Sequence, residues 1–230
     1  MLLHYKKDEF ETADYGEIHC IHHFPFDKTT TRKHPGIGPL RVLNDETIDV
    51  GAGYDMHKHR DMEIITYVYQ GKLSYEDSLG HTGHLQKGSV QYLSAGSGIT
   101  HKEENEGEKP LKLIQLWIEP NERGINPYYT NISVLENVRH NNLVHIISNK
   151  EKNGKITIKQ HINIYITELT HNHKQHIARK DNTQLYGVLL EGKATVNTKT
   201  LNAHDAFLTD EPLTLKTKEQ AHFLLVEIIH

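Results

Sequence analysis

The stretch "VGAGYDMHKHRDMEIITYVYQG", residues 50–71, places two histidines one residue apart, immediately before a run that is typical of a β-strand. In an extended strand the side chains at i and i+2 point to the same face, so His57 and His59 can direct both imidazoles at one point. Because the chain contains 19 histidines, one such pair is a weak motif. Whether this pair is half of a metal site therefore depends on a second set of ligands elsewhere.

A second pair of candidate ligands follows in "GSGITHKEEN", residues 96–105, where His101 and Glu103 again stand at i and i+2. If the two segments are facing strands, three neutral nitrogens and one carboxylate oxygen converge. This donor set suits Fe(II), Mn(II), Ni(II), Cu(II) or Zn(II) and leaves coordination positions for water, substrate or dioxygen. Two such pairs, each beside a glycine-rich turn, predict a metal site.

The rest of the chain favours an all-β protein. Short segments rich in Ile, Val, Tyr and Thr recur between Gly, Asn and Asp residues, a pattern typical of antiparallel strands. The pattern of residue types in "YVYQGKLSYEDS" in the first half recurs in "YGVLLEGKATVNT" in the second half. The polar stretch 119–143 between the halves contains Pro120 and Pro127 and reads as a connection. We expect two β domains, residues 1–125 and 126–230.

Composition excludes several classes of partner. The 230 residues carry a formal net charge of −4 without a visible basic cluster, so no direct binding to nucleic acid is expected. Charge appears by Lys6, and no stretch approaches the length of a membrane span, so we expect no membrane association and a cytoplasmic location. The single cysteine, Cys20, cannot form an intrachain disulfide, which agrees with a reducing compartment.

The surroundings of both ligand pairs resemble cupin motifs, and specifically the pirin family. Gly51-x5-His57-x-His59-x3-Glu63 resembles the first cupin motif, and Gly88-x5-Ser94-x-Gly96 with His101-x3-Asn105 resembles the second. The segments similar to pirins are "LRVLNDE", "HKHRDMEIITYV", "LSAGSGITHKEEN" and "IQLWIEPNERGINPYY", within residues 38–130. The resemblance to bacterial quercetinase-like pirins implies a bicupin, two antiparallel β-sandwich jelly rolls in one chain.

The pirin resemblance implies the ligand set. Pirins hold a metal with three histidines and the glutamate two residues after the third, which here are His57, His59, His101 and Glu103. One divalent transition metal per chain is expected, Fe(II) first, with Cu, Ni, Mn, Co or Zn as alternatives. Glu63 has a ligand position of other cupins that pirins do not use, so we expect it to support the site or the fold.

The second half is expected to lack a metal site. Aligning "LEG" at 190–192 with "YQG" at 69–71 puts Ala178 and Lys180 at the positions of the first two histidines. The histidine-rich stretch "HNHKQH", residues 171–176, is polar and lacks a nearby carboxylate pair, so a solvated loop is favoured over a metal site.

The same resemblance implies the quercetin 2,3-dioxygenase reaction on a flavonol and dioxygen, with ring opening and loss of carbon monoxide. Glu103 would then be the catalytic base that accepts the proton of the flavonol 3-hydroxyl. His22, Phe24 and Phe26 are candidate substrate contacts, although Thr29 and Thr30 stand where close relatives have tyrosines. The competing hypotheses are a metal-dependent redox-sensing or protein-binding regulatory module without turnover and another cupin reaction such as isomerisation.

Overall fold

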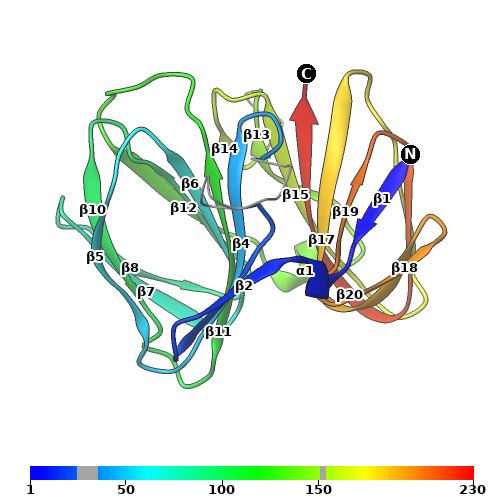
Figure 1. The fold of residues 1–230 in the computed structure, drawn as a ribbon, viewed down its shortest axis with the longest axis horizontal. Coiled ribbons are helices and arrows are strands. Elements are labelled where there is room, and N and C mark those ends of the chain that lie inside the picture. Colours follow the sequence, from blue (N-terminus) through cyan, green and yellow to red (C-terminus); the bar gives the residue numbers. More distant parts are fainter. Residues whose placement is uncertain (25–35, 151–153) are drawn as a thin grey trace. The chain divides into compact units, whose positions relative to one another are not determined.

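The computed structural model describes residues 1–24, 36–150 and 154–230, and most of them lie in β-strands (Figure 1). The chain divides into two compact units: an N-terminal unit of residues 11–134, and a C-terminal unit of residues 1–10 and 135–230. This grouping differs from the expected division at residue 125 in two respects: residues 126–134 belong to the N-terminal unit, and the first ten residues belong to the C-terminal unit. Among the described helices, none is both long and apolar enough to cross a membrane.

The N-terminal unit consists of two antiparallel sheets. The seven-stranded sheet has the order β12-β9-β6-β11-β4-β3-β2, and the four-stranded sheet has the order β5-β10-β7-β8. The strands of this unit are β2 (Glu11–Asp14), β3 (Ile18–His22), β4 (Leu40–Ile48), β5 (Gly53–His59), β6 (Glu63–Gln70), β7 (Lys72–Asp77), β8 (Thr82–Gln86), β9 (Ser89–Ser94), β10 (Ile99–Glu104), β11 (Leu111–Ile118) and β12 (Tyr128–Ser133).

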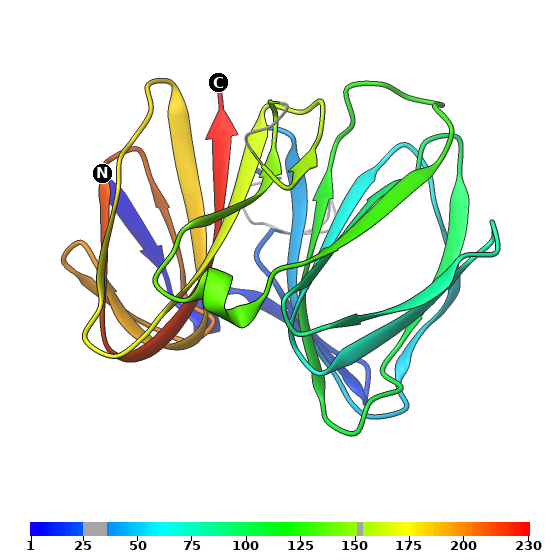
Figure 2. The same ribbon diagram turned by 180° about the vertical axis from the view of Figure 1, so that it is seen from behind.

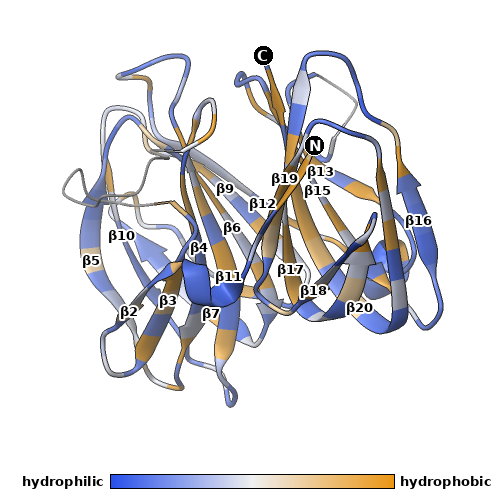
Figure 3. Cartoon of the chain, turned by 45° about the vertical axis from the view of Figure 1, so that its right-hand side comes forward, coloured by the Kyte–Doolittle hydropathy of each residue, from blue (hydrophilic) through white to orange (hydrophobic). Residues whose placement is uncertain are grey.

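Both sheets of the N-terminal unit contribute to one apolar core. Ile48 and Leu113 of the larger sheet pack in a single cluster with Leu73 and Leu85 of the smaller sheet. Hydrophobic and hydrophilic residues alternate along many strands (Figure 3), as expected when one face of a strand is buried and the other is not. The unit is therefore a β-sandwich.

The C-terminal unit is built on one nine-stranded sheet, whose main path is β1-β19-β17-β20-β15-β13-β14, with β16 paired to β20 and β18 to β17 (Figure 2). All of its strand pairs are antiparallel except β13 with β14. Its elements are β1 (Leu2–Tyr5), η1 (Lys7–Glu9), α1 (Glu136–Arg139), β13 (Val144–Ser148), β14 (Ile156–Thr157), β15 (Ile162–Leu169), β16 (Lys174–Ile177), β17 (Thr183–Val196), β18 (Lys199–Asn202), β19 (Ala206–Thr209) and β20 (Leu213–Ile229).

Two long strands, β17 and β20, pair along most of their length, and this pairing is interrupted twice. Their pairing register shifts between Leu189 and Glu191 and again between Gly192 and Ala194, and such bulges increase the local bend and twist. Gly192 has φ +87°, and a Cβ atom there would lie 2.0 Å from the carbonyl oxygen of Gln220. Glycine is required at this bend because of both its backbone conformation and the close approach of β20.

Candidate metal centre

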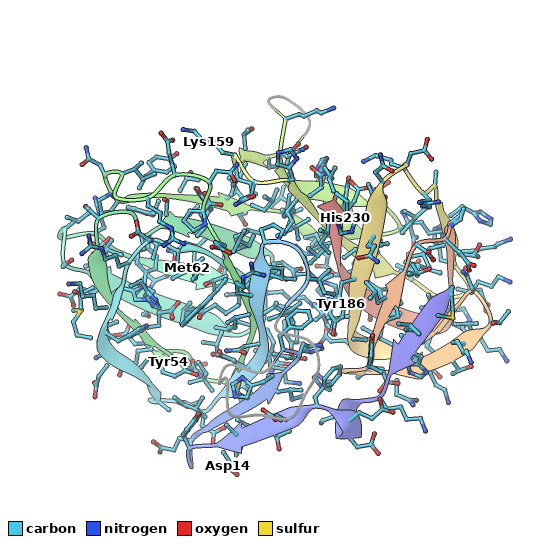
Figure 4. All side chains as sticks on the ribbon, turned by 45° about the horizontal axis from the view of Figure 1, so that its top comes forward. Asp14, Tyr54, Met62, Lys159, Tyr186 and His230 are labelled. Carbon is cyan, nitrogen blue, oxygen red and sulfur yellow. The ribbon has the colours of Figure 1, made fainter. Side chains whose placement is uncertain are left out.

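The pairing of β5 with β10 brings the two predicted ligand pairs together. His57 lies directly opposite His101, and a register shift follows between His101 and Glu103. His59, His101 and Glu103 are buried, whereas His57 is half-buried. Tyr54, labelled in Figure 4, lies on the same strand β5. The alternation of strand side chains therefore delivers all four residues to one region, as the i and i+2 spacing predicts.

The three imidazoles form a compact cluster. The Nε2 atoms of His57 and His101 are 3.1 Å apart, and the three ring centroids are separated by 4.5–4.9 Å. One nitrogen from each of His57, His59 and His101 lies within 4.8 Å of the other two. Glu103 stands beside this cluster, with its Oε2 atom 4.0 Å from His101 Nε2.

The hydrogen bonds of these side chains fit a bound cation. His57 Nδ1 donates to the backbone carbonyl oxygen of Asp55 at 2.8 Å, which leaves the lone pair of its Nε2 facing the cluster. His59 Nε2 and Glu103 Oε1 are buried, and neither atom has a hydrogen-bond partner among the residues that the structure describes. Buried polar atoms are nearly always satisfied, so these two atoms indicate a site for a positively charged ligand.

Burial also sets the charge state of the cluster. It lowers the pKa of His59 to about 3, with further contributions from His101 and His57, and lowers the pKa of His101 to about 4. Both imidazoles are therefore neutral at physiological pH, the form that binds metals. Burial raises the pKa of Glu103, because its ionised form has lost water, although His57 and a hydrogen bond from Gln115 act in the opposite direction.

Glu103 is positioned by β11. Gln115 Nε2 donates to Glu103 Oε2 at 3.1 Å, and Trp117 Nε1 donates to Gln115 Oε1 at 2.8 Å. The Trp117 ring also contacts His59 edge-on, with centroids 5.1 Å apart. Sequence analysis missed the role of Gln115, although it stands two residues before Trp117 and therefore shares its strand face.

A pocket of about 430 Å³ opens beside the cluster, and His57, His59 and Glu103 form part of its lining. A polar group from β4 and β5 lines the same pocket: Glu46 accepts hydrogen bonds from Asn44 Nδ2 and Tyr54 Oη, both at 3.1 Å. Burial, together with the charge of Glu103, raises the pKa of Glu46 to about 7. Sequence analysis missed this polar group, because Asn44 and Glu46 come from a different strand, β4, than the histidines.

The predicted substrate contacts have different positions. His22 lines the pocket, and its Nδ1 donates to Asn44 Oδ1 at 2.9 Å. Phe24 is only 3% exposed and is not among the described residues that line the pocket. Strand β3 ends at His22, so the alternation that brings Cys20 and His22 into the pocket does not extend to Phe24. Phe26, Thr29 and Thr30 lie outside the described residues.

Glu63 stands apart from the ligand cluster. It is 5% exposed, and its Oε1 accepts a hydrogen bond from Tyr92 Oη at 3.3 Å. Its carboxylate oxygens do not belong to the group of potential ligand atoms formed by His57, His59 and His101.

A second group of potential ligands, Glu136, His140 and Glu168, lies in the C-terminal unit. Arg139 is buried there, and its Nε lies 2.8 Å from Glu168 Oε1, while His140 Nε2 lies 3.2 Å from Glu168 Oε2. The guanidinium already supplies a cation to the buried carboxylate. We interpret this group as a structural ion-pair network.

The strand pair β16 and β20 carries no comparable ligand set. Gln175 lies opposite Leu215, and Ile177 opposite Leu213. His171 is exposed, but residues 174–176 of the stretch expected to be a solvated loop lie in strand β16.

Comparisons with known proteins agree with this architecture. The Pirin family model matches residues 5–118, and the model of the quercetinase C-terminal cupin domain matches residues 145–228. A pirin-like protein of Caulobacter vibrioides is 33% identical over 96% of both chains, and quercetin 2,3-dioxygenase of Escherichia coli K12 is 29% identical over 97% of this chain and 96% of that protein. The crystal structure of the E. coli bacterial pirin YhhW in complex with nickel(II) has a TM-score of 0.90 at 27% identity, covering 100% of this chain and 99% of that chain.

The fold and the two family-model matches together define a bicupin, which is a chain of two cupin domains. The first of these domains carries the histidine cluster. The chain belongs to the pirin family.

Proposed function

We propose that the N-terminal unit holds one divalent transition metal on His57, His59 and His101, with Glu103 as the fourth ligand. The convergence of three imidazoles beside the buried Glu103 carboxylate is the observation that carries this proposal. Iron(II) is the proposed metal, because a set of three nitrogens and one carboxylate suits first-row ions and leaves open positions. The nickel(II) complex of YhhW supports the same class of ion.

We further propose that the metal centre cleaves a flavonol such as quercetin with dioxygen, as a quercetin 2,3-dioxygenase. The E. coli relative that bears this name supports the assignment, and so does the position of the pocket directly beside the ligands. A volume of about 430 Å³ lies within the range of about 300–1,000 Å³ that is usual for small-molecule sites. Tyr54 and Trp117 give this pocket flat aromatic walls that suit a planar substrate.

The ligated metal would act as a Lewis acid toward the flavonol and bring dioxygen to it. Glu103 Oε1, which has no hydrogen-bond partner in the described part of the chain, accepts the proton of the 3-hydroxyl. Gln115 holds the other carboxylate oxygen and so fixes the direction in which Oε1 points. Glu46 and Asn44 offer hydrogen bonds to the remaining hydroxyls and orient the ring system in the pocket.

Replacement of Glu103 by glutamine tests this function. Glu103→Gln keeps the size of the side chain and one oxygen but removes the proton acceptor, so aerobic quercetin breakdown should fall by about 10²–10⁴. Metal content is measured on the same sample, and rates are compared at equal occupancy. Glu104→Gln is the matched control, because Glu104 follows on the same strand and forms an ion pair with Lys102 instead.

Equal rates for metal-loaded parent and Glu103→Gln would remove Glu103 from the chemistry and leave it as a ligand only. Should the parent show no oxygen-dependent turnover with Fe, Cu, Ni, Mn, Co or Zn, the dioxygenase proposal fails. The protein would then be a metal-dependent binding or regulatory module.

A further inference from the structure

The C-terminal unit contains a cavity of its own, of about 200 Å³. Much of its wall is apolar and comes from residues around the edge of the apolar core of this unit. These apolar wall residues are Leu143, Ile177, Leu185, Leu213 and Leu225. The predicted equivalents of the first two metal ligands, Ala178 and Lys180, also line the cavity.

Several polar side chains interrupt this apolar wall, and the buried carboxylate among them is Glu227. Glu227 lines the cavity although only 6% of the residue is exposed. Its Oε2 atom accepts three hydrogen bonds: from Asn163 Nδ2 at 2.6 Å, from Lys180 Nζ at 2.8 Å and from Tyr165 Oη at 3.2 Å. The Lys180 ammonium and the Glu227 carboxylate balance each other in charge.

The second carboxylate oxygen, Glu227 Oε1, receives no hydrogen bond from the described part of the chain. Glu227 Oε1 is not among the fully buried polar atoms that lack a partner, so it stays accessible and can accept a hydrogen bond from a molecule outside the chain. Water can supply this hydrogen bond, but water gains nothing from the apolar wall of Leu185, Leu213 and Leu225. A molecule with both an apolar body and a hydrogen-bond donor satisfies both parts of the cavity.

We propose that this cavity is a second binding site, for a small neutral hydroxyl compound of the size of a single-ring phenol. The hydroxyl donates to Glu227 Oε1, and the apolar body packs against Leu185, Leu213 and Leu225. A neutral ligand is specified because Lys180 already compensates the charge of Glu227. The volume lies below the range of about 300–1,000 Å³ that drug-sized ligands occupy, which excludes a three-ring flavonol.

Titration of the full-length, chelator-treated protein with three matched probes tests the ligand class. Phenol, toluene and benzylammonium share one ring and differ in the hydrogen-bond donor and the charge. Phenol should bind with a Kd of about 1 mM and shift NMR signals of residues around the cavity. Toluene should bind at least about tenfold more weakly, because it leaves Glu227 Oε1 without a donor.

Two variants locate the site. Glu227→Gln keeps the shape of the side chain but replaces one acceptor oxygen with an amide donor, so phenol affinity should fall about tenfold or more. Leu185→Phe adds volume at a half-buried position of the wall and should abolish phenol binding. Leu2→Phe is the matched control, since Leu2 is half-buried against the same core but does not line the cavity.

Several outcomes would overturn the proposal. They are equal binding of toluene and phenol, tighter binding of benzylammonium, no phenol-dependent shift near the cavity, or unchanged phenol affinity in folded Leu185→Phe. If Glu227→Gln does not fold, Leu185→Phe alone decides. Because the protein is free of metal in these titrations, their failure would leave the proposed dioxygenase function untouched.

Discussion

The two units of this pirin contain polar groups in similar β-sandwich cavities but compensate their charge differently. In the N-terminal unit, the Nε2 atoms of His57 and His101 lie 3.1 Å apart, and Glu103 Oε1 has no donor among the described residues. In the C-terminal unit, Lys180 neutralises Glu227 with its own ammonium group. The first arrangement offers ligand atoms to a cation, whereas in the second arrangement the carboxylate already has a cationic partner within the chain. This difference is the reason why we propose a metal site in the first unit and a metal-free binding site in the second.

Loss of metal from single-histidine variants is the largest effect expected from this contrast. His57→Ala and His101→Ala should each reduce metal content from about one ion per chain to nearly none, because two imidazoles and a carboxylate hold the ion much more weakly. Both variants should remain folded, since the apolar cores supply most of the stability of units of this size. Metal analysis by mass spectrometry and circular dichroism on the same sample measure both properties.

His171→Ala provides the control, because His171 is exposed in the stretch 171–176. It should retain the metal content of the parent. Two tightly held ions per parent chain would break the contrast between the units, and unfolding on chelation would show that the metal is structural.

The periodicity of β-strands explains why the candidate metal ligands and the all-β class could be predicted from the sequence. The strand period of two residues places His57 and His59, and likewise His101 and Glu103, on one face, and the structure brings these four residues together. The all-β class followed from the same alternation and is confirmed.

Other features depend on pairings that a single strand cannot encode. Gln115 and Glu46 reach the pocket because β11 and β4 pair with each other, far from the histidines in sequence. The first strand, β1, joins the C-terminal unit by pairing with β19, so that Leu2 lies opposite Thr209. Neither pairing leaves a local signal in the sequence.

The buried ion pair of the C-terminal unit should be the larger contributor to stability. Arg139→Met keeps a long side chain but leaves Glu168 without the guanidinium, so the free energy of unfolding should fall by about 3–5 kcal/mol. Urea denaturation measures the loss. Arg123→Met removes an exposed arginine from Glu119 and should change stability by less than about 1 kcal/mol. Similar losses in both variants would contradict the internal compensation of Glu168.

The metal-free N-terminal unit contains buried carboxylates without a cationic partner of this kind. Its free energy of unfolding should therefore depend on pH. The pKa of Glu46 is raised from 4.5 to about 7, mainly by burial. Between these pH values the folded protein retains a proton that the unfolded chain releases, so the free energy of unfolding falls as pH rises through this window. A pKa raised this far corresponds to about 3 kcal/mol.

Glu46→Gln should remove this loss. The metal-free variant and parent should be equally stable near pH 4, and the variant should be more stable by up to about 3 kcal/mol at pH 8. Urea denaturation across the pH range measures the difference. Glu76→Gln, at an exposed position, should follow the parent at every pH. A parent stability that does not fall between pH 4.5 and 7 would contradict the raised pKa of Glu46.

The smallest expected effect concerns Gln115, which positions Glu103 without contacting the ligand nitrogens. Gln115→Leu removes the donor to Glu103 Oε2 and the acceptor of Trp117 Nε1, so Glu103 Oε1 should lose its fixed direction. We expect kcat for quercetin to fall about tenfold, with KM and metal content nearly unchanged, because misdirected proton acceptors slow chemistry more than binding. Trp117 is the only tryptophan, so its fluorescence reports directly whether the indole hydrogen bond has been lost.

Gln70→Leu is the control, because Gln70 bonds the carbonyl oxygen of Pro110 and does not line the metal pocket. It should leave kcat and Trp117 fluorescence unchanged. Gln115→Glu separates positioning from simple packing: the added carboxylate would repel Glu103, so kcat should fall at least as far as in Gln115→Leu even though the side-chain volume is retained. A Gln115→Leu protein with altered Trp117 fluorescence but unchanged kcat would show that Glu103 needs no support from β11. The metal and the strand β10 alone would then fix the direction of its carboxylate.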